Sequence, residues 1–91
     1  MDRKILKKII EKWGRENQIN KLQEELLELA LVLNQMKCPT KNSLEMESKL
    51  YDELADVKIT MAQAEMIFDE KRINERVRFK LNKLKSKHPD I

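Results

Sequence analysis

Two segments of this chain repeat one helical pattern. Residues 21–33 read KLQEELLELALVL and residues 49–61 read KLYDELADVKITM, and they align at an offset of 28 positions. In both segments, apolar residues recur at the three- and four-residue spacing of a single helix face. Each segment also carries two carboxylates three residues apart, namely Glu25 with Glu28 and Glu53 with Asp56. The pattern therefore predicts two similar helices, each with an acidic pair beside an apolar stripe.

The composition favours an all-α fold. With one Gly and two Pro in 91 residues, the chain lacks the turn residues that a sheet needs at short intervals. A chain of this length makes a single domain, residues 1–91. We expect a helical bundle in which two long helices run antiparallel to each other. Because a short chain buries little surface, we also expect oligomerisation to complete a four-helix core.

The spacing of apolar and helix-breaking residues predicts the elements. They are a short N-terminal helix within 1–14, a long helix over about 17–36, a loop over 37–43, a second long helix over about 43–68 and a basic C-terminal helix over 70–87. Pro39 is the breaker in the loop, and Asn42 with Glu45 has the spacing of a capping box. Whether the chain breaks at Asp69 or only bends there is left open by the sequence.

The apolar stripes predict the core and an assembly. The expected inward residues are Leu22, Leu26, Leu29 and Leu33 on the first long helix, Leu50, Leu54, Val57, Met61, Ala64 and Phe68 on the second, and Ile73, Val77, Leu81 and Leu84 on the last. Further apolar residues widen the surface of the first long helix past what one neighbour covers; these are Ile19, Leu27, Ala30 and Val32. Because such a patch is unusual on a monomer, we expect a homodimer or a homotetramer.

The acidic pairs indicate a divalent cation. A helix turns about 100° per residue, so two acids three residues apart project about 60° from each other, here at the margin of the apolar stripe. If the two stripes pack together, the four carboxylates converge, and they repel and raise one another's pKa unless a cation lies between them. Oxygen ligands suit Mg²⁺ or Mn²⁺. The alternative is a solvated helix surface on which Lys21 pairs with Glu25, and two copies of the motif leave both interpretations open.

These motifs and their surroundings resemble the MazG-type, all-α nucleoside triphosphate pyrophosphohydrolases. The run Glu24-Glu25-Leu26-Leu27-Glu28 and, after a gap of 24 residues, Glu53-Leu54-Ala55-Asp56-Val57 resemble the EExxE…ExxD motif of that family. Residues shared with the short, phage-type members precede the first motif: Trp13, Gln18 and Lys21. The resemblance extends over about residues 10–85.

The resemblance implies a Mg²⁺-dependent enzyme that cleaves a nucleoside triphosphate between its α and β phosphates, giving a monophosphate and pyrophosphate. The implied metal ligands are Glu25, Glu28, Glu53 and Asp56, and the implied catalytic carboxylates are Glu24, Glu25 and Glu53. Glu24 would share a second metal ion or orient the attacking water. Gln18 and Lys21 would contact phosphate or base, and Trp13 would stack on a base unless it is a core anchor.

The C-terminal segment carries the alternative function. Its basic residues are Lys71, Arg72, Arg76, Arg78, Lys80, Lys83, Lys85 and Lys87. Such a run is usually a solvated helix surface, but it also suits a non-enzymatic nucleic-acid-binding or adaptor module. Because aromatic residues are scarce, nucleic acid is the less favoured partner. No apolar run suits a membrane span or a signal peptide, and Cys38 is the only cysteine, so we expect a cytoplasmic protein.

Overall fold

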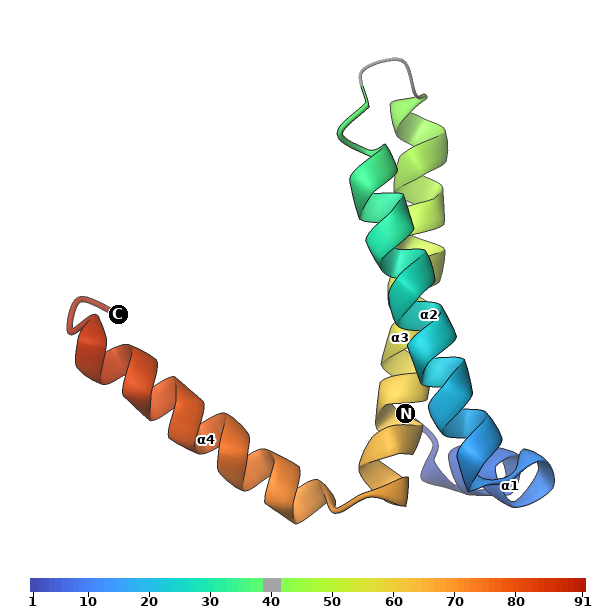
Figure 1. The fold of residues 1–91 in the computed structure, drawn as a ribbon, viewed down its shortest axis with the longest axis horizontal. Helices are drawn as coiled ribbons and strands as arrows, with labels where there is room; N and C mark the ends of the chain where they lie inside the picture. Colours follow the sequence, from blue (N-terminus) through green and yellow to red (C-terminus); the bar gives the residue numbers. More distant parts are fainter. Residues whose placement is uncertain (39–41) are drawn as a thin grey trace.

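The computed structural model describes residues 1–38 and 42–91. In these ranges the chain forms four helices and no strand (Figure 1). The helices are α1 (Arg3–Trp13), α2 (Arg15–Gln35), α3 (Ser43–Ile67) and α4 (Glu70–Lys87). The all-α class is therefore confirmed. None of these helices is long and apolar enough to cross a membrane. The predicted breaker Pro39 lies outside the described residues.

Short polar side chains begin three of the helices. The side chain of Asp2 accepts a hydrogen bond from the backbone N–H of Lys4, and that of Asn42 accepts from the N–H groups of Leu44 and Glu45. The cap predicted at Asn42 is thus confirmed, because its carboxamide oxygen occupies two of the free donors at the helix start. Between α1 and α2, Gly14 turns the chain at φ 89°, a backbone conformation that favours glycine.

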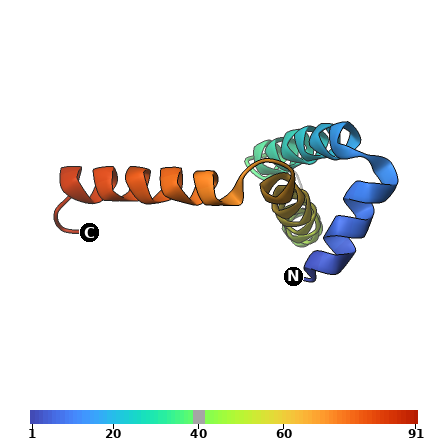
Figure 2. The same ribbon diagram turned by 90° about the horizontal axis from the view of Figure 1, so that it is seen from below.

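The contact between α2 and α3 forms most of the core. The two helices lie side by side along much of their length, and α1 packs against both and buries Leu6 (Figures 1 and 2). Apolar residues buried in this region include Val32, Met46 and Ala64. Four polar residues are buried with them: Gln18, Glu25, Thr60 and Gln63. A core with so many polar groups is unusual, and it locates the site described below.

The buried side of α2 and α3 differs from the predicted stripe. Half of the predicted residues are buried or half-buried, but Leu26, Leu33, Leu54, Met61 and Phe68 are more than 40% exposed. Glu25, which was expected at the margin of the apolar stripe, is instead buried, with 4% of its surface exposed. The reason is geometric, since each apolar surface is wider than one neighbouring helix covers.

The inward stripe predicted for the last helix is wrong for the single chain. No residue of α4 is buried, and Val77, Leu81 and Leu84 are about half exposed. Phe68 leaves the helical conformation at ψ −133°, and Asp69, at φ −128°, caps α4 by accepting from the N–H of Arg72. The chain therefore breaks at Asp69, and α4 projects away from the other helices (Figures 1 and 2).

Candidate metal centre

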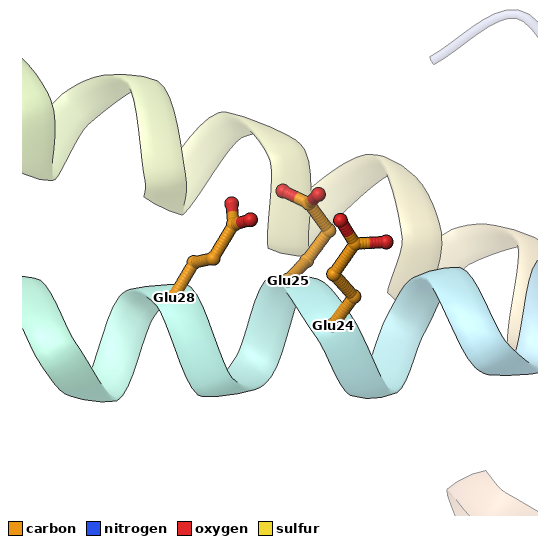
Figure 3. Close-up of side chains that lie close together, drawn as sticks. All are labelled: Glu24, Glu25 and Glu28. Atoms are coloured by element: carbon orange, nitrogen blue, oxygen red, sulfur yellow. The ribbon is translucent and has the colours of Figure 1, made fainter.

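Five carboxylates gather where the two repeat segments meet. Figure 3 shows the side chains of Glu24, Glu25 and Glu28 rising from α2 on the side of α3. Oxygens of these three residues lie within 4.8 Å of one another. A second group consists of Glu25 of α2 with Glu53 and Asp56 of α3, and oxygens of these three residues also lie within 4.8 Å of one another. Glu25 belongs to both groups, so the structure brings all the predicted metal ligands to one place.

Two oxygens of this cluster are buried and have no partner. Oε2 of Glu25 and Oε2 of Glu53 are enclosed, and neither accepts a hydrogen bond. Buried polar atoms are almost always paired, so such atoms require a physical explanation. A bound cation is one such explanation, because it would neutralise the carboxylates and occupy their free lone pairs.

The electrostatics of the cluster agree with this interpretation. Burial raises the pKa of Glu25, and the neighbouring carboxylates of Asp56 and Glu28 raise it further, against the opposing effect of Lys21. Burial also raises the pKa of Glu53, followed by the charges of Glu28 and Glu25. The ionised forms are therefore disfavoured in the metal-free protein. A divalent cation would reverse this penalty.

Lys21 neutralises one edge of the cluster. Its Nζ lies 3.3 Å from Oε1 of Glu25 and 3.6 Å from Oε2 of Glu24, and the hydrogen bond to Glu25 raises the pKa of the lysine. The ammonium group does not reach Oε2 of Glu25, which stays unpaired. Because the Lys21 side chain is about half exposed, it is also free to turn toward an anionic ligand.

A cavity of about 500 Å³ opens beside the acids. The three residues predicted to bind substrate line it together with two of the acids: Trp13, Gln18, Lys21, Glu25 and Asp56. Trp13 is 51% exposed, so it is not the buried core anchor that was the alternative interpretation. Lys12 places its Nζ 4.8 Å from the centre of the indole ring.

Sequence reasoning missed three polar residues of this cavity: Asn17, Thr60 and Gln63. Asn17 donates to the carbonyl of Trp13 at 2.7 Å, and Thr60 donates to the carbonyl of Asp56 at 2.9 Å. Their helical spacing was a usable signal, because Thr60 and Gln63 lie four and seven residues after Asp56 and so share its side of α3.

The chain matches no protein-family model, no curated protein and no solved structure.

The donor set fits a hard divalent cation. All its available ligands are carboxylate oxygens, which suit Mg²⁺ or Mn²⁺. Cys38 is exposed beyond the end of α2 and His88 ends α4, so neither adds nitrogen or sulfur to the cluster. The arrangement is suited to holding an anionic ligand through a cation, next to a cavity that can receive the rest of that ligand.

Proposed function

We propose that this protein is a Mg²⁺-dependent nucleoside triphosphate pyrophosphohydrolase of the MazG type. The observation that carries the proposal is the buried Glu25, which joins two carboxylate groups and has an unpaired oxygen. Acid pairs on a solvated helix surface do not need such burial. The motifs EExxE and ExxD add the resemblance to this family.

Each acid has a role in the proposal. Glu25, Glu28, Glu53 and Asp56 hold the metal, with Glu25 and Glu53 supplying their unpaired oxygens. When bound, Mg²⁺ supplies charge neutralisation, polarises phosphoryl oxygens and lowers the pKa of a water molecule. Glu24, the most exposed of the three acids on α2, shares a second metal ion or orients the attacking water in this proposal.

Lys21 is the basic group that completes the binding of the phosphates. Lys21 exchanges its contact with Glu25 for a phosphate oxygen once the carboxylates are neutralised. The basic helix α4 has eight Lys and Arg residues against two Glu, but none of them lines the cavity beside the acids, so α4 does not supply this charge within one chain. No glycine-rich phosphate loop is present in the sequence, so backbone amides do not replace these charges.

We further propose that the protein acts as a homodimer or a homotetramer. Leu26 and Leu54 each follow a buried or half-buried acid by one residue, and Leu33 and Met61 lie seven residues further along the same helices. In a pair of antiparallel helices, residues placed this way form one surface, about 100° from the acids. Association through these four exposed apolar side chains would leave the acidic cluster open and would complete a four-helix core.

Product analysis tests the reaction. Incubation with nucleoside triphosphates and Mg²⁺, followed by phosphorus NMR, is expected to show a nucleoside monophosphate and pyrophosphate as the only products. EDTA is expected to stop the reaction. Release of orthophosphate with a diphosphate would instead indicate attack at the γ-phosphate and would refute the proposed mechanism.

The exposed basic helix supports a second candidate, a nucleic-acid-binding or adaptor module. Its eight basic residues and its half-exposed Val77, Leu81 and Leu84 are available to a partner. Binding to nucleic acid through α4 would weaken steeply as salt is raised and would need no metal. Salt-sensitive, EDTA-resistant binding combined with no hydrolysis of any triphosphate would favour this candidate.

A further inference from the structure

Two buried amides face the cavity beside the acidic cluster without a partner. Gln18 is 8% exposed and Gln63 is 2% exposed, and both line the cavity. Within residues 1–38 and 42–91, no hydrogen bond engages the side-chain amide of either one. The fully enclosed side-chain atoms that lack partners belong to Glu25 and Glu53 in this part of the chain. The two glutamines therefore line the wall of the cavity, with the side chain of Gln63 almost completely covered by its neighbours.

This combination indicates a ligand with a polar edge. Buried polar groups are normally paired, so an amide that is buried and unpaired at a cavity wall indicates a group that completes its hydrogen bonds. A carboxamide presents a donor and an acceptor side by side, which matches the paired donor and acceptor at the edge of a nucleobase.

The other walls of the cavity suit a flat, aromatic ligand. Ile9 and Ile59 provide apolar surface, and the half-exposed indole of Trp13 stands at the same opening. Aromatic rings bind bases by stacking. The volume of about 500 Å³ lies within the usual range for small-ligand sites.

We propose that this cavity binds the base of the nucleotide and that Gln63 determines which base is preferred. The inference rests on the proposed function, because Glu25 and Asp56 line the same cavity and would receive the phosphates through the metal. Gln63 is assigned this role ahead of Gln18 because it is the more deeply buried. Gln18 precedes Lys21 by three residues on α2, whereas Gln63 lies on α3.

The test uses ligands that cannot be hydrolysed by the proposed reaction. Trp13 is the only tryptophan, so its fluorescence reports occupation of the cavity. In Mg²⁺, which neutralises the acids beside the cavity, titration with nucleoside monophosphates is expected to give a saturable change. Gln63→Leu is expected to weaken binding of the preferred base by about tenfold or more, because the base edge then meets no partner. Gln63→Glu, which replaces a donor with an acceptor, is expected to change the order of preference among the bases.

Gln23→Leu is the matched control, since Gln23 is exposed on α2 and does not line the cavity. It is expected to leave every affinity unchanged. Circular dichroism checks that each variant is helical, and Gln63→Glu keeps the test valid should the leucine variant unfold. The inference is overturned if no monophosphate binds the parent protein, or if both Gln63 variants keep the parent's affinities and order. Monophosphate binding without triphosphate hydrolysis would support the base site and refute the proposed enzymatic activity. Triphosphate hydrolysis that both Gln63 variants leave unchanged would support the activity and refute the role of Gln63.

Discussion

Replacing Glu25 with glutamine is expected to stabilise the metal-free protein and to remove its response to Mg²⁺. The carboxylate is 4% exposed, its Oε2 has no partner, and its pKa is raised chiefly by burial. A buried polar group without a partner costs about 1–3 kcal/mol, and more if it is charged. The variant removes that charge and loses the ion pair with the half-exposed Lys21, which is worth about 0.5 kcal/mol.

The net gain in the free energy of unfolding is therefore about 1 kcal/mol at neutral pH, because the buried amide keeps part of the desolvation cost. For a domain of this size, about 1 kcal/mol corresponds to a rise in Tm of roughly 4–8 °C. The parent protein responds to metal in the opposite way. Mg²⁺ at about 100 times its Kd should stabilise the parent by about 2.7 kcal/mol and should leave the variant unchanged.

Thermal unfolding followed by circular dichroism, in EDTA and in Mg²⁺, measures both effects. Glu47→Gln is the matched control, because Glu47 is an exposed acid on α3 outside the cluster. It should melt like the parent in EDTA and keep the full response to Mg²⁺. The reasoning fails if Glu25→Gln melts below the parent in EDTA, or if Mg²⁺ raises the Tm of both variants equally.

Three further outcomes are expected. Glu53→Gln should remain helical by circular dichroism yet lose Mg²⁺-dependent turnover, and activity within a few fold of the parent would exclude Glu53 as a ligand. In EDTA, stability should fall as pH rises from about 4.5 through the raised pKa values of Glu25 and Glu53, since the folded protein holds these protons more tightly than the unfolded chain. Scans of Tm against pH should show this decline in the parent and its loss in Mg²⁺. Light scattering at micromolar concentration should show a dimer or tetramer for the parent. The double variant Leu26→Asp/Leu54→Asp should be a monomer, whereas the control Leu27→Asp should still associate. A monomeric parent would contradict the proposed assembly.

Local patterns in the sequence determined the helices and the placement of the acids. The three- and four-residue spacing of apolar residues is a property of the helix itself, and it identified both α2 and α3. The cap at Asn42 is equally local, because its side chain bonds to backbone groups two and three residues away. The repeat also indicated that Glu25 and Glu53 would meet, since each lies at the same position relative to its stripe.

Tertiary structure alone decided which part of each apolar surface is buried and what lies beside the acids. A helical period gives the direction of a side chain around its own axis but does not specify where the neighbouring helix sits, so Leu54 and Met61 are exposed while Glu25 is enclosed. Gln63 acquired its setting in the same way, because the cavity that it lines is formed by residues of α1 and α2 as well as of its own helix. The direction of α4 depends on the backbone angles at Phe68 and Asp69, and no periodicity in the flanking residues fixes those angles.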